Sequence, residues 1–545
     1  MKDPLAPLLA IAHQGMPLTA RDGQTFIRLG APSGGFYIFP IRSRAYRDWF
    51  LHTFYAEYDT LPTSRAFHAI LNHLEAEANQ NGPEDRFAVW RRVGTRGPGH
   101  ILLDLSDNQC QFVEITSTGW KTTAVDGTHF QTSCSTISLP EPMPRAAQAP
   151  STLGSPAPGP WPPAPIALDT LRSFLNLRSR ADWLRCVAWL LSTLRPKGSF
   201  PVLVLQGPPG SGKSLAAVIL RSLIDPCTSP LTPIPSSVRD LLTLARHNWV
   251  LGFDHISDLS PQLTDALCRL SSGLGATLRE TPSHSTEPLQ QYFKRPVLLT
   301  VTERWSCPSD LAERALIVDF PPFPPSETES PDYPHPGPRT ELSLLKAFEE
   351  AWPRILADLC SAASIALSRI DQFELPSAGP GREARCASAL AWAMAASPAL
   401  GCTEEEMQQA FALPRSPSRS AEHPIVEAVR NLLAQRGRWT GSATELRDLL
   451  QPLVSSRKPG SSKTPRVSKS PRGISQQLKN STLTLADIGI EFRFKRLGKG
   501  RRAIELRDDL GDANCQEDRR FASPDPKPPP QTTEKEQPTK SSSKK

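Results

Sequence analysis

No apolar run in this 545-residue sequence is long enough to cross a membrane, because a spanning helix needs roughly 20 consecutive apolar residues. The longest runs, 201–205 and 387–400, are shorter, and Pro398 interrupts the second. Prolines also break the apolar run 5–12, and no small-residue cleavage site follows it. We therefore expect a cytoplasmic protein that does not span a membrane.

The sequence also lacks any Cys-x-x-Cys pair, and none of its ten cysteines has a neighbouring histidine at a spacing typical of zinc sites. This pattern argues against a cysteine-based zinc site and against a disulfide framework. We predict reduced thiols that are mostly buried.

An even distribution of charge is missing as well. The formal net charge is +7, yet residues 457–502 hold 13 Lys and Arg against only Asp487 and Glu491, which makes that stretch +11 and the remainder about −4. The basic character is therefore local and needs a local explanation, such as a nucleic-acid partner.

Proline is abundant, at 56 of 545 residues, and it is concentrated in connecting segments. Residues 139–165 consist mainly of Pro, Ala, Gly and Ser, which favours a semi-rigid linker over a helix or a central strand. A shorter linker is predicted at 411–422, and the polar, lysine-ended tail 511–545 is predicted to be disordered.

Residues 18–138 are predicted to form a mixed α/β domain. One helix is expected to begin after Ser43 and a second after Thr63, each with apolar residues at helical spacing. Strands are expected at 101–105 and 112–116. The aromatic side chains here are typical of a core rather than of a binding platform, and no chemistry can be inferred from this domain.

A phosphate-binding loop is predicted between a short buried strand at 201–205 and a helix at 215–223. The loop matches the pattern G-x-x-x-x-G-K-[ST], in which backbone N–H groups surround a β-phosphate, the lysine neutralises phosphate oxygens and the final hydroxyl is a ligand of Mg²⁺. The eight residues are Gly207, Pro208, Pro209, Gly210, Ser211, Gly212, Lys213 and Ser214.

Asp254 ends an apolar strand about forty residues downstream and is the candidate for the second Mg²⁺ ligand, the alternative being a simple strand-end cap. His255 follows it, where many ATPases of this kind carry a glutamate that polarises the attacking water. A histidine in place of that glutamate argues against rapid hydrolysis of ATP. Glu280 or Glu303 could replace that glutamate, although each is more typical of a solvated surface carboxylate.

Two further positions are candidates for contacts with the γ-phosphate. A third strand at 296–301 ends around Thr300 and Thr302, and either threonine could be a polar sensor or part of a plain strand end. Arg314 precedes the last strand, where it could reach the nucleotide of a neighbouring subunit or pair with a nearby carboxylate. Arg269 and Arg279 flank a loop that could reach DNA or nucleotide.

The basic stretch is predicted to belong to a compact C-terminal module of three helices followed by a β-hairpin, which is the element order of a winged helix. In such a domain the third helix enters the major groove and the hairpin contacts the backbone, whereas a winged helix that binds protein is the alternative. The candidate DNA-binding residues are Lys469, Arg472, Gln476, Lys479, Lys495, Arg496, Lys499 and Arg501.

The segments 201–221, 248–259, 265–270, 295–299 and 310–316 resemble the ATP-binding, helicase-like proteins of bacterial mobile elements and phages. That group is similar to the AAA+ and superfamily 3 helicase portion of primase-helicases, and the resemblance extends over about 18–506. His255 and Thr300 stand where this group is expected to have asparagine. The resemblance implies a role in mobile-element replication or maintenance, but residues 1–165 show no primase motif.

Together these observations predict a multidomain α/β protein with a P-loop NTPase core of AAA+ type, an N-terminal α+β domain and a C-terminal winged helix. Its predicted parts are a domain at 18–138, a linker at 139–165, an ATPase domain with helical lead-in and lid at 166–410, a linker at 411–422, a winged helix at 423–507 and a tail at 511–545. We expect an ATP- and Mg²⁺-dependent DNA motor that forms a homo-oligomeric ring. The alternatives are a DNA-binding regulator or loader that uses ATP as a switch and, with less support, an ATPase that binds RNA.

Overall fold

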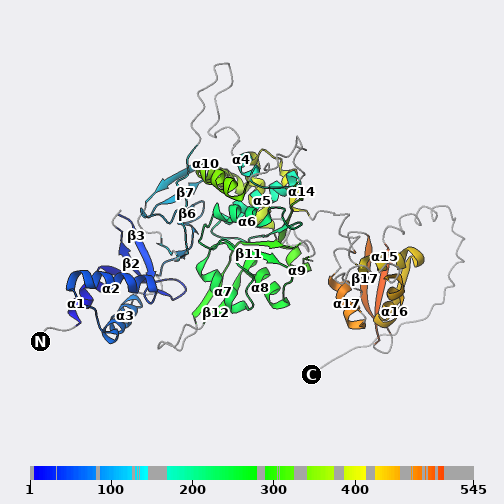
Figure 1. Cartoon of the computed structure of the whole chain (residues 1–545), viewed down its shortest axis with the longest axis horizontal. Helices are drawn as coiled ribbons and strands as arrows, with labels where there is room; N and C mark the ends of the chain where they lie inside the picture. The colour runs from blue at the N-terminus through cyan, green and yellow to red at the C-terminus, as the bar shows by residue number, and fades with distance from the viewer. Residues whose placement is uncertain are drawn as a thin grey trace, which may run out of the picture. The chain divides into compact units, whose positions relative to one another are not determined.

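The computed structural model divides the chain into two compact units, Met1–Leu413 and Pro414–Lys545 (Figure 1). The residues that it describes are 5–31, 34–80, 86–124, 129–131, 133, 135–144, 168–278, 289–302, 305, 307–323, 340–373, 386–412, 424–454, 468, 470–480, 485, 489–497 and 501–508.

A four-stranded parallel sheet forms the centre of the first unit, and it contains the strands predicted at 201–205 and 296–301. Its order is β11 (Leu251–Ile256), β14 (Val297–Val301), β10 (Val202–Gln206) and β15 (Ala315–Asp319). Beyond β11, Thr232 adds one parallel bridge to Phe253. The strands are rich in Val, Leu and Ile because both faces of the sheet are covered.

Successive residues of each strand enter different cores, since side chains alternate between the two faces. Leu203 and Leu205 pack with α5 (Arg180–Thr193) and α6 (Lys213–Ser222), whereas Val202 and Val204 pack with α7 (Val238–His247) and α8 (Pro261–Ser272). In Figure 1, α5 and α6 lie above β11, and α7 and α8 lie below it. The sheet is therefore the middle layer of an α/β/α arrangement.

Further helices extend the core on the α5 side. They are α10 (Glu341–Arg369), η2 (Ile370–Gln372), α12 (Ala387–Ala395), α13 (Ser397–Leu400) and α14 (Glu404–Phe411), while the four-residue α9 (Ser309–Ala312) precedes β15. The predicted helical lead-in to the ATPase domain consists of two helices, because α4 (Leu168–Arg172) ends before α5 begins. Ser179 caps α5 by accepting a hydrogen bond from the backbone N–H of Asp182 (3.2 Å).

The N-terminal segment builds an antiparallel sheet of β1 (Gly15–Thr19), β2 (Thr25–Gly30) and β3 (Phe36–Pro40). α1 (Ala6–Ala12), α2 (Arg44–Tyr58) and α3 (Ser64–Ala78) pack together on it in one apolar core. The predicted caps are confirmed, because Ser43 accepts from the N–H of Tyr46 and Thr63 from that of Ala66.

A second antiparallel sheet connects this region to the parallel sheet. It consists of β5 (Val93–Gly94), β6 (Ile101–Asp104), β7 (Phe112–Thr116) and β8 (Gly119–Thr123), beside a short parallel pair of β4 (Val89–Trp90) and β9 (His129–Phe130). The Trp120 indole donates to Ser361 Oγ on α10 (2.9 Å), and Ser364 Oγ donates to the Thr116 carbonyl (2.6 Å). The apolar core thus continues across the proposed division between 18–138 and 166–410.

The hairpin of β12 (Leu274–Leu278) and β13 (Leu289–Phe293) was not predicted, although it occupies the loop region flanked by Arg269 and Arg279. Arg269 lies on α8 with its guanidinium 3.7 Å from Asp265. Arg279, Glu280 and Glu303 lie outside the described residues.

The second unit contains α15 (Pro424–Arg436), β16 (Arg438–Gly441), α16 (Ala443–Val454), α17 (Pro471–Asn480), β17 (Ile490–Leu497) and β18 (Arg501–Asp508). The predicted third helix begins after Ser470, whose hydroxyl accepts from the N–H of Gly473 (3.0 Å). The predicted hairpin is present, but the sheet has a third strand, β16, which pairs with β18. The unit has an apolar core of its own.

Among the described residues, no helix is both long enough and apolar enough to cross a bilayer. Eight of the ten cysteines lie in the described part of the chain, and all eight are free thiols, as predicted; Cys186, Cys227, Cys268, Cys360 and Cys386 are buried.

Candidate nucleotide site

The glycine loop at the carboxyl end of β10 adopts a backbone that only glycine tolerates well. Gly207, Gly210 and Gly212 have φ angles of 153°, 77° and 87°. A Cβ atom at Gly207 would collide with the carbonyl oxygen of Phe320, which directly follows β15. Close packing against the neighbouring strand therefore fixes the start of the loop.

Lys213 is the first residue of α6, so the unpaired backbone N–H groups of that helix face the same region as its ammonium group. Its Nζ donates to the carbonyl oxygens of Gly207 (2.9 Å) and Pro208 (2.7 Å), and lies 3.3 Å from Ser211 Oγ. The ammonium is thus held directly over the loop, where phosphate oxygens would replace the backbone acceptors.

Ser214 and Asp254 are in direct contact, although forty residues separate them. Ser214 Oγ donates to Asp254 Oδ1 at 2.9 Å. A hydroxyl and a carboxylate beside a phosphate-binding loop are oxygen ligands of the kind that Mg²⁺ prefers, since this ion takes one or two protein ligands and completes its shell with phosphates and water. The two side chains therefore fit a magnesium site.

A β-bulge explains how Asp254 reaches this position. Phe253 pairs with Leu299 and Ile256 pairs with Val301, so two residues of β11, Asp254 and His255, face the single residue Thr300 of β14. His255 adopts a left-handed backbone with φ of 57°. Thr300 consequently contacts both residues: its hydroxyl donates to Asp254 Oδ1 and accepts from the N–H of His255 (2.9 Å).

β14 lies between β10, which precedes the glycine loop, and β11, which carries Asp254. Thr300 is 2% exposed and its hydroxyl orients Asp254, whereas Thr302 contributes its backbone N–H to Ile256. The His255 side chain is exposed, so an imidazole rather than a carboxylate occupies the position after Asp254.

Arg314 lies at the amino ends of the parallel strands, whereas the glycine loop lies at their carboxyl ends. The Val202 N–H at the start of β10 donates to the Arg314 carbonyl (2.8 Å), whereas the glycine loop follows the end of β10. The five residues of β10 separate its two ends by about 15 Å. The guanidinium donates to the backbone carbonyl of Asp310 (2.9 Å). Arg314 does not reach the nucleotide site of its own chain.

Asn176, which sequence reasoning missed, braces the loop from the turn between α4 and α5. Its buried Nδ2 donates to the carbonyls of Ser211 (3.1 Å) and Pro321 (2.7 Å). This contact joins the loop to the segment after β15. A single asparagine between leucines carries no sequence signal for such a role.

A buried ion pair between Arg185 and Asp182 contacts the backbone of β15. Arg185 Nη1 donates to Asp182 Oδ1 (2.8 Å) and to the carbonyl of Ile317 (3.2 Å), and its Nε donates to the carbonyl of Ala410 (2.6 Å). Burial raises the pKa of Asp182, while Ser179 and Arg185 act in the opposite direction. These contacts fix α5 and α14 against the strand whose end shapes the glycine loop.

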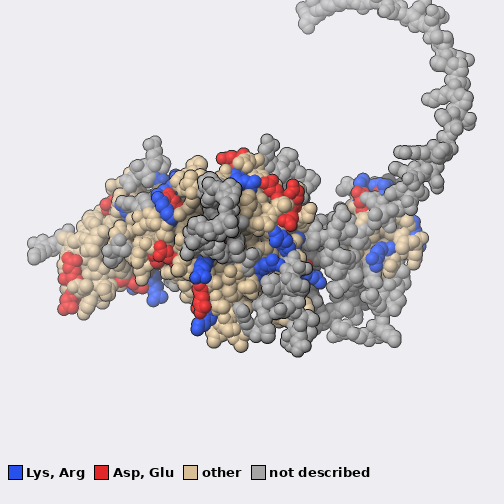
Figure 2. Space-filling model, turned by 90° about the horizontal axis from the view of Figure 1, so that it is seen from above, with Lys and Arg blue, Asp and Glu red and all other residues tan. Residues whose placement is uncertain are grey.

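The structure describes only some of the candidate DNA-binding residues of the C-terminal unit. Arg472 and Gln476 are exposed on α17, opposite the buried Ile474 and Leu478. Figure 2 shows Lys and Arg side chains on the described surface of this unit. Lys469 and Lys499 lie outside the described residues, as do the side chains of Lys479, Arg496 and Arg501.

Lys495 is engaged within the C-terminal sheet. Its Nζ lies 2.5 Å from Glu505 Oε2, and Arg438 and Arg507 contact the other oxygen of the same carboxylate. Glu505 therefore forms ion pairs with three basic side chains and offsets part of their positive charge.

Two family models match the chain, and both describe replication proteins of mobile genetic elements. Residues 168–378 match the model for an actinomycete integrative conjugative element replication protein, and residues 425–519 match the model for the C-terminal domain of the same RepA family. Over these two segments the chain is similar to that family, in agreement with the mobile-element resemblance of the sequence.

Similarity to solved structures is weak. The apo C-terminal region of NrS-1 is 8% identical, with 93% of this chain and 100% of that chain covered at a TM-score of 0.38. A JCV helicase is 14% identical, with 44% and 71% covered at a TM-score of 0.21. Both TM-scores are too low to establish a shared fold. No curated protein sequence matches the chain.

Proposed function

We propose that this chain is a helicase-like replication protein of an integrative conjugative element, an ATP- and Mg²⁺-dependent motor that acts on DNA. The observation that carries the proposal is the contact between Ser214 and Asp254 beside the glycine loop. P-loop ATPases hold Mg²⁺ and the terminal phosphates with these residue types. The family matches support the role in replication.

In this proposal the chain binds ATP through the loop 207–214. Backbone N–H groups and the start of α6 meet the phosphates, and Lys213 exchanges its carbonyl acceptors for phosphate oxygens. Ser214 and Asp254 hold Mg²⁺, which supplies charge neutralisation at the phosphates. Thr300 acts as a positioning residue, because its hydroxyl fixes the rotamer of Asp254.

The position of Arg314 supports a homo-oligomeric motor. It lies about 15 Å from the loop of its own chain, at the opposite end of the parallel strands. A guanidinium in that place can stabilise phosphoryl-transfer charge only in the site of a neighbouring subunit. We therefore propose a ring in which each Arg314 completes the nucleotide site of the next subunit.

The C-terminal unit is proposed to be a DNA-binding winged helix. Its order of three helices followed by a hairpin, with Arg472 and Gln476 exposed on the third helix, supports the assignment. In such domains the third helix reads the major groove and the hairpin contacts the backbone.

One observation favours a second function, that of a DNA-binding regulator or loader that uses ATP as a switch. His255 occupies the place of the water-polarising glutamate, and Thr300 is already engaged with Asp254. Such a protein would bind ATP tightly and hydrolyse it slowly.

Turnover of ATP by the full chain, measured alone and with single- or double-stranded DNA, separates the two functions. A motor shows DNA-stimulated turnover and separates the strands of a forked duplex, with Asp254→Asn as the inactive control. Tight ATP binding with slow, unstimulated turnover and no strand separation would establish the switch and refute the motor.

A further inference from the structure

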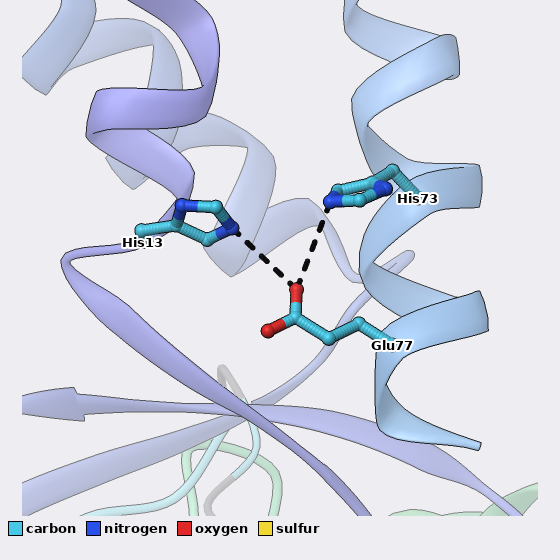
Figure 3. A group of neighbouring side chains, drawn as sticks. All are labelled: His13, His73 and Glu77. Atoms are coloured by element: carbon cyan, nitrogen blue, oxygen red, sulfur yellow. Dashed lines mark ion pairs between the residues drawn. The ribbon is translucent and has the colours of Figure 1, made fainter. Parts of the chain in front are cut away.

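A second group of potential metal ligands lies in the N-terminal part of the chain, distant in sequence from the nucleotide site. His13 directly follows α1, and His73 and Glu77 lie on α3. Figure 3 shows both imidazole rings turned toward the Glu77 carboxylate. The Nε2 atoms of His13 and His73 lie 3.5 and 3.8 Å from the same oxygen, Glu77 Oε2.

The local structure explains why these three side chains meet. His73 and Glu77 are four residues apart on one helix, so they share a face. α1 packs against α3 through the buried Leu8, Ile11 and Ala12, and this contact brings the end of α1 beside that face. Two helices therefore supply the set.

The geometry suits a small cation. One potential ligand atom from each residue lies within 4.8 Å of the other two. In a tetrahedral zinc site with bonds of roughly 2.0–2.1 Å, ligand atoms are about 3.4 Å apart. The two observed nitrogen–oxygen distances are close to that spacing without any metal to draw the ligands together.

The carboxylate oxygen at the centre of the group has no hydrogen-bond partner among the described residues. Glu77 Oε2 is shielded from solvent and accepts no hydrogen bond from the described residues, which is costly for a buried acceptor. The neighbouring carboxylate Glu75 is different, because Arg42 binds both of its oxygens at 2.6 and 2.7 Å. Glu77 is thus the acid on this face that remains available to a cation.

We propose that His13, His73 and Glu77 bind a divalent transition-metal ion of the Zn²⁺ class. Two imidazole nitrogens and one carboxylate favour such an ion over Mg²⁺ or Ca²⁺, which take oxygen ligands. Three protein ligands leave one position for solvent, since the three side chains are 50%, 53% and 38% exposed. The ion would join the end of α1 to α3 and so fix residues 6–19 on the first sheet.

A competing explanation is a pair of ordinary ion pairs. Those need protonated imidazoles, whereas metal ligation needs a free Nε2 lone pair. The two readings therefore differ in whether the group binds a cation at all.

Zinc binding to the full chain at neutral pH, with Mg²⁺ in excess and no nucleotide, tests the proposal. Titration against a chromogenic chelator is expected to show one equivalent of bound Zn²⁺, and Co²⁺ is expected to give the visible absorption of a low-symmetry nitrogen and oxygen site. His73→Ala and Glu77→Gln should each weaken binding at least tenfold, as should His13→Ala. Zn²⁺ should also raise the melting temperature of the wild type and not that of these variants.

His68→Ala is the matched control, since His68 is an exposed histidine on the same helix and outside the group. It should bind Zn²⁺ like the wild type. All four positions are at least partly exposed, so their variants are expected to fold, and circular dichroism verifies this. Equal Zn²⁺ affinity in the wild type and in His73→Ala and Glu77→Gln, or no stoichiometric binding by the wild type, would overturn the proposal.

Discussion

Thr300 donates its hydroxyl hydrogen to Asp254 Oδ1 from the strand next to the one that carries the carboxylate. The contact exists because the bulge in β11 places two residues opposite one. A polar residue at the end of β14 therefore acts on the candidate metal ligand.

Replacing Thr300 by valine removes this hydrogen bond while keeping the shape of the side chain. Loss of a partner that orients a metal ligand typically costs about 10- to 100-fold in metal affinity or activity. We expect the Mg²⁺ concentration for half-maximal ATP turnover to rise by roughly that factor. Thr300→Ser should restore it, and a Thr300→Val protein with a normal Mg²⁺ dependence would contradict the positioning role.

Lys213→Ala should abolish nucleotide binding. Nζ is held over the loop by the carbonyls of Gly207 and Pro208, in the position where phosphate oxygens would lie. Fluorescent-nucleotide titration measures the effect, and Lys346→Ala on the exposed surface of α10 is the control. Unchanged ATP affinity in a folded Lys213→Ala protein would refute the assignment of the loop.

Arg314→Ala should lower turnover by roughly a thousandfold or more, but only when subunits assemble. Asp254→Asn should keep nucleotide binding and lose Mg²⁺-dependent hydrolysis. Mixing the two inactive proteins should recover part of the activity, because some interfaces then combine an intact metal site with an intact arginine. If no mixing ratio recovers activity, Arg314 does not act in the site of a neighbour.

Glu505 should make the C-terminal unit sensitive to acid. Lys495, Arg438 and Arg507 hold the pKa of this carboxyl at about 2, below its ordinary value of 4.5. A lowered pKa in the folded state means that the stabilisation is complete above about pH 4.5 and is lost as the pH falls toward 2.

The melting temperature of the C-terminal transition, followed from pH 6 to about pH 2, measures this effect. Glu505→Gln should lower the melting temperature at pH 6 and flatten its dependence on pH. Glu491→Gln removes an exposed acid that contacts only Arg493 among the described contacts, so it serves as the control. Equal pH profiles for wild type and Glu505→Gln would show that the contacts of this carboxylate contribute nothing.

DNA binding should reside in the C-terminal unit, which can be tested as a fragment because it has its own core. With four to six phosphate contacts, log affinity should fall against log salt with a slope of about −4 to −5. Removing Lys499 and Arg501 together should reduce the slope by about 2 for all sequences.

Arg472→Ala should relax preference at one base position by about 1 to 3 kcal/mol if this side chain reads a base edge. Arg430→Ala on α15 is the control for loss of one exposed positive charge. A fragment without DNA binding at low salt would make the unit a protein-interaction module.

Local chemistry explains what the sequence could predict. The helix caps Ser43, Thr63 and Ser470 each bind a backbone N–H only three residues away, and the glycine loop is one continuous segment. Each of these features can therefore be recognised in a short stretch of sequence. The strands of the parallel sheet could be predicted because they are apolar runs that end in polar residues.

The remaining features depend on contacts between distant residues. Asn176 reaches the loop across 35 residues, and the Arg92–Asp225 ion pair (3.2 Å) joins residues 133 apart. The bulge at Asp254 depends on the pairing partner that β14 provides, and β16 forms a strand only because β18 lies beside it. The cluster of His13 with His73 and Glu77 depends in the same way on how α1 packs against α3.

β15 joins the glycine loop to Arg314 within one chain. At one end, Phe320 and Pro321 contact the glycine loop and its brace Asn176; at the other end lies Arg314. The strand pairs with β10 along its length, so its two ends are held at a fixed separation. In the proposed ring, this strand would connect one nucleotide site with the arginine that serves the next, so we expect ATP binding at one site to change ATP turnover at its neighbour.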